Sequence, residues 1–240
     1  MEPNKNKFAL VTGATKGIGR AVSFALAQAG YSIIICARNQ KKLEEFQRWL
    51  GETCPTADVL VRVCDFSIPE QRASLLQWLD QEQMIVEVLV NNVGMFEPFS
   101  IFDEAPDTLE RHMQVNLFAP YQLSAHIGRQ MRDLRQGHII NISSIASRQA
   151  VPSAASYTVT KYALAGLTAV LREEMRTAGV KVTEIIPGST LTASWEGTEV
   201  PSSEFVLPED IADAVLSILK MSPGANVDEI LIRPLKGQVS

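Results

Sequence analysis

Cysteine and histidine are scarce in this chain, which has three residues of each. The cysteines, Cys36, Cys54 and Cys64, are odd in number and lack C-x-x-C spacing, which argues against a disulfide framework or a zinc site. Cys36 and Cys64 end apolar runs, so we expect both to be small buried hydrophobic residues. None of the histidines has a convincing nucleophile motif nearby, which disfavours a hydrolase triad.

The chain also lacks a basic excess and long apolar runs. Its net charge of −5 is not typical of a nucleic-acid-binding protein. The best apolar run, 33–37, is too short to cross a bilayer and is typical of a buried strand. Residues 1–7 are polar and lack the apolar core of a signal peptide. These features predict a soluble, cytoplasmic protein without nucleic-acid or membrane partners.

Strand and helix patterns alternate along all 240 residues, which indicates one domain spanning residues 1–240. Seven apolar runs predict strands: Phe8–Thr12, Ser32–Ala37, Asp58–Val63, Val86–Asn91, His138–Ile142, Lys181–Ile186 and Glu229–Ile232. Six periodic segments predict helices: Gly17–Ala29, Gln40–Leu50, Pro69–Gln83, Thr108–Arg135, Ser156–Thr177 and Pro208–Leu219. Val- and Ile-rich strands separated by helices predict a doubly wound (Rossmann) α/β fold, a seven-stranded parallel sheet with helices on both faces.

Helix boundaries carry their own signals. Ser67-Ile68-Pro69-Glu70 predicts a capping box at Ser67, with proline in the first turn. Gly30 and Gly179 follow helical runs, where a left-handed residue is expected. The least regular stretch is 188–207, which we expect to be a functional or mobile loop.

The segment Thr12–Gly19 has the spacing G-x-x-x-G-x-G between the first strand and the first helix. Glycines let backbone N–H groups approach a phosphate closely, and a helix N-terminus carries partial positive charge. The spacing matches the G-x-G-x-x-G dinucleotide fingerprint only in part, so a tight turn used for packing is the alternative.

Cofactor choice is expected at the end of the second strand. An acidic residue there would bind the ribose hydroxyls of NAD, but this chain has Ala37 followed by Arg38. Arg38 and Lys16, which lies in the glycine turn, can pair with a 2′-phosphate. The alternative is that both are solvated surface charges. Two cations and no acid favour NADPH.

Polar residues and glycines follow the next strands at the same edge of the sheet. Asp65 either accepts a hydrogen bond from an adenine amino group or stabilises its own turn. Asn92 either binds cofactor or ties adjacent strands together. Gly94 allows close approach of a ribose.

Tyr157 and Lys161 are four residues apart on a predicted helix and therefore share a face. An ammonium near a phenol lowers the phenol pKa, which suits Tyr157 to acid–base chemistry near pH 7. Y-x-x-x-K alone is a weak signal, since an exposed helical pair gives the same pattern. Ser144, at the end of the preceding strand, and Asn116, in the helix before it, make the signal specific.

Together these motifs resemble the short-chain dehydrogenase/reductase family over essentially the whole chain. The matching residues, in family order, are Thr12-Gly13-x-x-x-Gly17-Ile18-Gly19, Asn91-Asn92-Val93-Gly94, Asn116, Ser144, Tyr157-x-x-x-Lys161 and Pro187-Gly188 with Thr192. Val93 departs from the usual alanine and is expected only to shift packing near the cofactor.

The resemblance implies roles for these residues. Tyr157 exchanges a proton with the carbonyl or alcohol oxygen, Ser144 hydrogen-bonds that oxygen, and Ser143 is the competing candidate. Lys161 binds the nicotinamide ribose and lowers the pKa of Tyr157, while Asn116 holds a water that relays protons to Lys161. The expected NADP(H)-binding residues are Gly13, Thr15, Lys16, Gly17, Ile18, Gly19, Arg38, Asp65, Phe66, Asn92, Gly94, Tyr157, Lys161, Pro187, Gly188, Thr190 and Thr192.

The substrate is expected between two apolar segments, 95–99 and the loop 188–207, with Arg148 as the one nearby charge. These segments favour an apolar ketone or aldehyde, and hence a carbonyl reductase. A 3-oxoacyl-(acyl carrier protein) reductase is the alternative, although its usual glycine-rich C-terminus is missing. A non-catalytic NADP(H) sensor is a further alternative, disfavoured because no catalytic residue is lost. Family resemblance also implies a homodimer or homotetramer through the helices 108–135 and 156–177.

Overall fold

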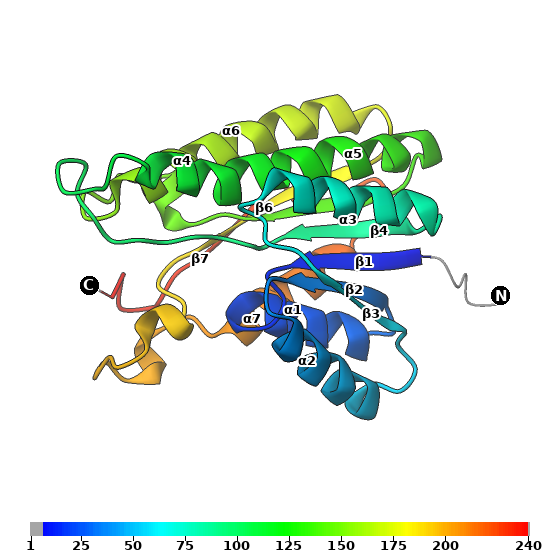
Figure 1. Cartoon of the computed structure of the whole chain (residues 1–240), viewed down its shortest axis with the longest axis horizontal. Coiled ribbons are helices and arrows are strands. Elements are labelled where there is room, and N and C mark those ends of the chain that lie inside the picture. Colours follow the sequence, from blue (N-terminus) through cyan, green and yellow to red (C-terminus); the bar gives the residue numbers. More distant parts are fainter. Residues whose placement is uncertain (1–6, 240) are drawn as a thin grey trace.

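The computed structural model describes residues 7–239, so the polar segment 1–6 considered above lies outside the described residues. Its centre is one parallel sheet with the strand order β3-β2-β1-β4-β5-β6-β7 (Figure 1). The strands are β1 (Lys7–Thr12), β2 (Ser32–Ala37), β3 (Val59–Val63), β4 (Ile85–Asn91), β5 (His138–Ile142), β6 (Lys181–Pro187) and β7 (Glu229–Ile232). Each predicted strand is confirmed to within one residue at either end.

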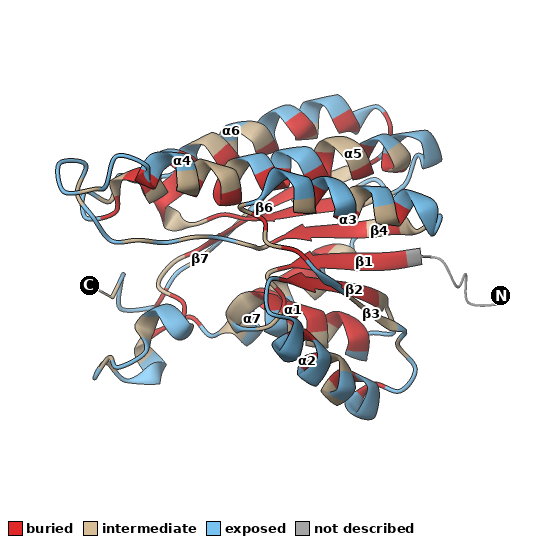
Figure 2. Ribbon diagram, viewed as in Figure 1, coloured by how far each residue is buried: buried red, intermediate tan, exposed pale blue. Residues whose placement is uncertain are grey.

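Helices cover both faces of the sheet, which confirms the doubly wound prediction (Figure 1). One face packs against α1 (Gly17–Gln28), α2 (Gln40–Thr53) and α7 (Pro208–Leu219). The other packs against α3 (Pro69–Gln81), α5 (Ala119–Leu134) and α6 (Ala155–Arg176). The buried residues concentrate in the sheet and on the inward faces of these helices (Figure 2).

The strand order reverses direction around β1, which lies between β2 and β4. In an open parallel sheet, the loops after the strands diverge at this point and leave a crevice at the carboxyl edge. The glycine turn follows β1 and residues 92–107 follow β4, so both segments border that crevice. The fold therefore places the predicted cofactor and substrate segments at one edge.

One local prediction is wrong and another needs refinement. The helix expected over 108–135 is confirmed to within one residue, but it contains a π-helical turn (Gln114–Phe118) between α4 (Thr108–Met113) and α5. The capping box at Ser67 is absent: α3 begins after Ile68, and the Ser67 hydroxyl instead donates to Asp65. Gly30 and Gly179 do adopt the expected positive φ, at 87° and 74°.

The three cysteines are buried and free, as expected for Cys36 and Cys64. Within residues 7–239, no helix has the length and apolar character needed to span a membrane. The same residues contain no cluster of three or more His, Cys, Asp or Glu side chains that could hold a metal ion.

Candidate active site

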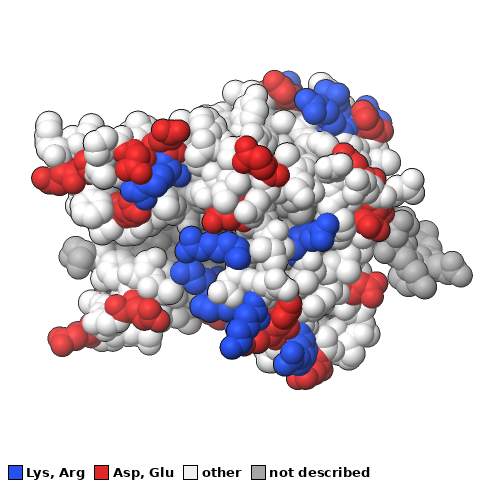
Figure 3. Space-filling model, in the orientation of Figure 1, with Lys and Arg blue, Asp and Glu red and all other residues white. Residues whose placement is uncertain are grey.

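A cleft of about 550 Å³ opens at the carboxyl edge of the sheet. It is lined by the glycine turn, the ends of β2 to β5, the start of α6 and residues 192–194. Lys and Arg side chains gather on the face drawn in Figure 3, beside a hollow between the two helical layers that cover the sheet. Most of the predicted site residues line this cleft: Gly13, Thr15, Lys16, Gly17, Ile18, Arg38, Asp65, Phe66, Asn92, Gly94, Tyr157, Lys161 and Thr192.

The glycine turn depends on its glycines for steric reasons. Gly13 and Gly17 have φ of 67° and 52°, in the left-handed region that side chains rarely adopt. A Cβ on Gly19 would lie 2.4 Å from the Asn92 Nδ2 and 2.5 Å from the Gly13 carbonyl oxygen. Helix α1 begins here with no side-chain cap and no acidic residue in its first turn. Its leading N–H groups are thus left for an anion.

Lys16 and Arg38 both line the cleft and both are exposed. Neither forms an ion pair or a side-chain hydrogen bond with any residue in the described range 7–239. Two cations that line one cleft, each without an ion pair or side-chain hydrogen bond in that range, fit a phosphate group.

Asp65 makes the contacts of a turn aspartate. Its Oδ1 accepts hydrogen bonds from the Ser67 N–H at 2.9 Å and the Ser67 hydroxyl at 2.6 Å. Burial raises the pKa of Asp65, but these hydrogen bonds and the nearby Arg38 guanidinium bring it below its usual value. The turn interpretation is therefore supported, while the adenine contact stays a prediction.

Asn92 ties β4 to the glycine turn. Its Nδ2 donates to the Thr12 carbonyl at 2.8 Å and to that of Gly13 at 3.3 Å. The Thr12 hydroxyl accepts from the N–H groups of Asn92 and Val93. Of the two roles considered for Asn92, the structure supports the tie between adjacent strands.

Tyr157 and Lys161 lie on the first turns of α6 and face the cleft together. The Lys161 Nζ lies 5.5 Å from the centroid of the Tyr157 ring. It donates a hydrogen bond to the Ile142 carbonyl at the end of β5, at 3.1 Å. This bond fixes the ammonium against the tip of β5, so Lys161 is held over the face of the ring.

Ser143 and Ser144, the two candidates for the hydrogen bond to the substrate oxygen, have different surroundings. The Ser144 hydroxyl is hydrogen-bonded to Tyr157 and also accepts from the Ala146 N–H at 3.2 Å. The Ser143 side chain lines the cleft, and its buried hydroxyl has no hydrogen-bond partner among the described residues. A buried hydroxyl without a partner is costly, which fits a polar ligand group at this point of the cleft.

Asn116 is buried in the π-helical turn between α4 and α5. Its Oδ1 accepts from the Met95 N–H at 2.7 Å, and its Nδ2 donates to the Met95 carbonyl and to the Thr160 hydroxyl, each at 3.0 Å. A Cβ placed on Gly94 would be 3.7 Å from the Asn116 Oδ1 and 4.0 Å from the Lys161 Nζ. Asn116 therefore secures the segment after β4 next to Lys161. Single π-helical turns of this kind are frequent at functional sites.

The expected lowering of the Tyr157 pKa is not found in this arrangement. Burial raises the pKa of Tyr157, and the hydrogen bond with Ser144 opposes that rise. Lys161 lies over the ring rather than at the phenol oxygen. Burial also lowers the pKa of Lys161 to about 8, although the Glu184 carboxylate acts in the opposite direction.

Several predicted residues do not line the cleft. Asn116 and Ser144 lie just behind it, and Gly19 packs against the glycine turn. Gly188 is packed against the C-terminal segment, where a Cβ would meet Gln238 at 2.6 Å. The Thr190 hydroxyl donates to the Gly188 carbonyl instead of pointing to the cleft. Pro187 is likewise absent from its lining.

The loop between β4 and α4 contributes to the cleft and to the start of α6, including contacts that its sequence did not indicate. Phe96 and Glu97 line the cleft, and Glu97 is held by a 2.8 Å ion pair with Arg111. Glu104 accepts hydrogen bonds from the Ser156 N–H and hydroxyl at the start of α6. No local pattern marks Glu104, because its partner is 52 residues away.

Arg148, predicted as a charge near the substrate, is paired within the protein. It forms ion pairs at 2.8 Å with Glu184 and with Glu229. The only local signal for this pairing is a carboxylate, Glu184, inside the apolar run of β6.

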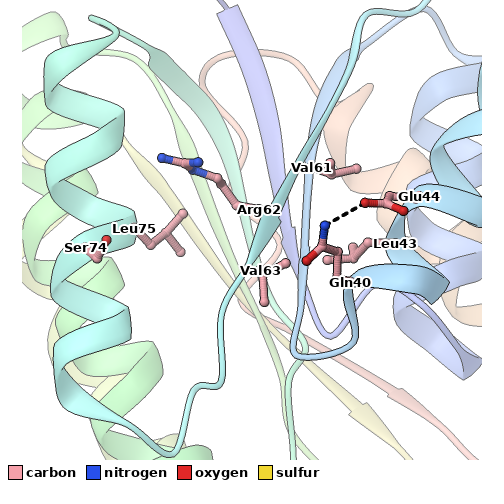
Figure 4. Close-up of a pocket in the computed structure, with 8 residues that line it drawn as sticks. All are labelled: Gln40, Leu43, Glu44, Val61, Arg62, Val63, Ser74 and Leu75. Carbon is pink, nitrogen blue, oxygen red and sulfur yellow. Dashed lines mark hydrogen bonds between the residues drawn. The ribbon is translucent and has the colours of Figure 1, made fainter.

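A second cavity, of about 320 Å³, lies at the outer edge of β3, between that strand and α2 and α3 (Figure 4). On its α2 side, the Gln40 amide donates to Glu44 at 2.8 Å, one helical turn along (Figure 4). Arg62 points toward α3, where its guanidinium lies 4.4 Å from the centre of the Trp78 ring. The residues lining this cavity include none of those predicted for catalysis.

The sheet order, the glycine turn and the cleft define a doubly wound α/β protein with a ligand site at its switch point. Residues 7–200 match the short chain dehydrogenase family. The chain thus belongs to the short-chain dehydrogenase/reductase family and is an oxidoreductase, of a family that typically acts on CH–OH groups.

Similar proteins support this assignment. An uncharacterised oxidoreductase of Staphylococcus aureus strain MRSA252 is 31% identical over 96% of this chain and 98% of its own. A metagenomic short-chain oxidoreductase solved with NADP is 30% identical, with a TM-score of 0.83 over 95% of this chain and 97% of that one. L-Sorbose reductase from Gluconobacter frateurii, solved with NADPH and L-sorbose, is 25% identical with a TM-score of 0.87 over 95% of each chain.

A 3-oxoacyl-(acyl carrier protein) reductase from Brucella melitensis has a TM-score of 0.85 over 95% of this chain and 90% of its own. Its identity is 24%, so the likeness concerns the fold alone.

Proposed function

We propose that this protein is an NADPH-dependent carbonyl reductase that uses Tyr157 as its general acid and base. The observation that carries the proposal is that Tyr157 and Lys161 line the same cleft as the glycine turn, with Ser144 hydrogen-bonded to Tyr157 just behind it. The residue after β5 supplies Ser144 and the first turns of α6 supply Tyr157 and Lys161. These are the groups that acid–base chemistry at a bound carbonyl requires.

The cleft fits a dinucleotide phosphate. The turn at Gly13 and Gly17 leaves backbone N–H groups accessible at the start of α1, and Lys16 and Arg38 add positive charge. The unpartnered Ser143 hydroxyl offers a polar contact farther along the same cleft. Solved relatives that contain NADP or NADPH support the same cofactor. When bound, NADPH supplies the hydride.

The chain's own residues perform the proton transfer and orient the substrate. The Tyr157 hydroxyl donates its proton to the carbonyl oxygen in reduction and accepts it back in oxidation. Ser144, already hydrogen-bonded to Tyr157, holds that oxygen in reach. Lys161 lines the same cleft, where its ammonium would bind the nicotinamide ribose. Asn116 fixes Gly94 and Met95 beside Lys161, and the water relay implied by the family stays part of the proposal.

The substrate side of the cleft favours an apolar or aromatic carbonyl compound. Phe96 lies at its wall next to Tyr157, and Trp195 and Phe205 pack together in the loop beyond Thr192 with ring centroids 5.0 Å apart. Arg148 is committed to Glu184 and Glu229, so the one basic residue expected there does not select a charged substrate.

The proposal is tested by a panel of ketones, aldehydes and 3-oxoacyl thioesters, each assayed with NADPH and NADH by the loss of nicotinamide absorbance. We expect turnover of apolar ketones or aldehydes with a strong preference for NADPH. A large preference for NADH would contradict the role of Lys16 and Arg38. Turnover confined to 3-oxoacyl thioesters would contradict the substrate class.

A further inference from the structure

Glu184 is a carboxylate buried inside the sheet. It lies in the middle of β6, with a relative exposure of 1%, between the apolar residues Val182 and Ile186 on the same face of the strand. Val182 belongs to the core that packs against α5 and α6, so Glu184 points to the same layer. An apolar residue would satisfy the packing, and a buried charge there needs another explanation.

The first contact of Glu184 leads to the turn that presents Ser144. Its Oε1 lies 3.2 Å from the Ser147 hydroxyl, which also lies 2.8 Å from the Ser144 carbonyl oxygen. The Ser147 N–H donates to the same carbonyl at 2.9 Å. Ser147 therefore links the carboxylate to the backbone of Ser144.

The second contact leads to Arg148. This guanidinium donates to the Glu184 Oε2 at 2.8 Å and approaches Glu229 at the same distance. Glu184 and Glu229 are paired in the register of β6 and β7, where two like charges alone would be destabilising. Arg148 lies between them and is held in place from both strands.

We propose that Glu184 is a positioning residue for the catalytic centre: through Ser147 and Arg148 it fixes the turn that carries Ser144. The inference rests on the proposed function. Glu184 acts through other residues and is not assigned a contact with substrate.

An electrostatic part follows from the position of Glu184 among the groups that act on Lys161. Its own helix α6 provides Tyr157, β5 provides the Ile142 carbonyl, and the π-helical turn provides the neutral amide of Asn116. From β6, Glu184 provides a negative charge that raises the pKa of Lys161, while burial lowers it to about 8. Glu184 itself faces Arg148 and, across that guanidinium, Glu229 of β7.

The test compares three variants under saturating NADPH with the best carbonyl of the panel. Glu184→Gln keeps the shape and hydrogen-bonding capacity of the side chain but removes its charge. Because Lys161 then loses its proton at lower pH, the alkaline limb of the kcat/KM profile for reduction should move down by about one pH unit. Ser147→Ala should lower kcat about tenfold without moving that limb, because the charge remains.

Glu229→Gln is the matched control, since it removes a carboxylate from Arg148 at a site away from Ser147 and Lys161. It should leave the pH profile unchanged, because Glu229 is not among the groups that act on the pKa of Lys161. A wild-type profile for Glu184→Gln overturns the electrostatic part, and so does an equal shift for Glu229→Gln. If Glu184→Gln does not fold, Ser147→Ala still tests the positioning part. A wild-type kcat for Ser147→Ala overturns that part.

Thermal unfolding of the cofactor-free protein separates this inference from the proposed function. The attraction between Glu184 and Lys161 exists only while Lys161 is protonated. Glu184→Gln should therefore lower the melting temperature more at pH 7 than at pH 9.5. In a Lys161→Met background the same substitution should have equal effects at both pH values. Equal effects with Lys161 present overturn the inference, even if no carbonyl of the panel is turned over.

Discussion

The ring of Phe96 meets the ring of Tyr157 edge-on, with centroids 5.0 Å apart and planes inclined at 89°. Phe96 is half-exposed and lines the cleft, so it forms both a packing partner for Tyr157 and a wall of the substrate site. Replacing Phe96 by alanine should lower kcat/KM for the carbonyl substrate about tenfold and leave the KM for NADPH nearly unchanged. Steady-state kinetics with each reactant varied in turn checks this.

Phe102 provides the control for Phe96, because it lies in the same loop and is 94% exposed. Phe102→Ala should behave as wild type. A similar loss in both variants would show that the loop as a whole, not the wall at Phe96, determines the effect.

Lys16 and Arg38 should act together on cofactor choice. The double variant Lys16→Ala/Arg38→Ala removes both cations from the cleft while leaving the glycines in place. We expect its KM for NADPH to rise at least about tenfold, with little change for NADH, because only NADPH carries the 2′-phosphate. The salt dependence of NADPH binding should also weaken, as measured by nicotinamide fluorescence. An unchanged ratio of the two cofactors would contradict the assignment.

Glu104 should stabilise the helix that carries Tyr157. Its carboxylate accepts from the Ser156 N–H at 2.8 Å and from the Ser156 hydroxyl, at the first turn of α6. Glu104→Ala should reduce the free energy of unfolding by about 1 kcal/mol, as for the loss of a helix cap. It should also reduce kcat, since Tyr157 is the next residue. Chemical denaturation and kinetics measure the two effects.

Glu110 is an exposed carboxylate of α4 and serves as the control for Glu104. Its replacement by alanine should leave both quantities unchanged. If Glu104→Ala lowers stability no more than Glu110→Ala does, the cap is not a support of α6.

His138 should make the protein sensitive to acid. It is buried in β5, where its Nε2 lies 2.8 Å from the Thr183 hydroxyl, and burial lowers its pKa to about 4. The unfolded state takes up a proton near the ordinary pKa of 6.5, whereas the folded state does not until about pH 4. Stability is therefore fully present above pH 6.5 and is lost as the pH falls toward 4, by up to roughly 3 kcal/mol.

Urea unfolding between pH 4 and 7 measures this loss. His138→Asn should flatten the curve, whereas His126→Asn, at a partly exposed position on α5, should keep the steep loss. A curve for His138→Asn as steep as that of the wild type would assign the acid sensitivity to other groups.

The sequence predicted the fold well because its strands are mostly apolar and its helices are periodic. Every strand from β1 to β7 is where its apolar run predicts. The π-helical turn at Gln114–Phe118 was not predictable, because it keeps the apolar pattern of an ordinary α-helix.

For the site, sequence order placed Tyr157, Lys161 and the glycine turn at one cleft, because parallel strands bring their carboxyl ends to one edge. Contacts between segments that are distant in the chain could not be predicted from the sequence. The bond from Glu104 to Ser156 and the ion pair between Arg148 and Glu184 depend on how the loops fold back. The pKa of Tyr157 was misjudged for a related reason: helical spacing gives the proximity of Lys161 but not the burial of both groups.

The central claim concerns Tyr157, whose hydroxyl is the proposed proton donor. The most direct measurement compares Tyr157→Phe with the wild type for carbonyl reduction and for NADPH binding by fluorescence. The phenylalanine ring keeps the contact with Phe96 and removes only the hydroxyl. We predict a loss of turnover of at least about a thousandfold with the affinity for NADPH changed less than about threefold. Turnover within about tenfold of the wild type would contradict the account.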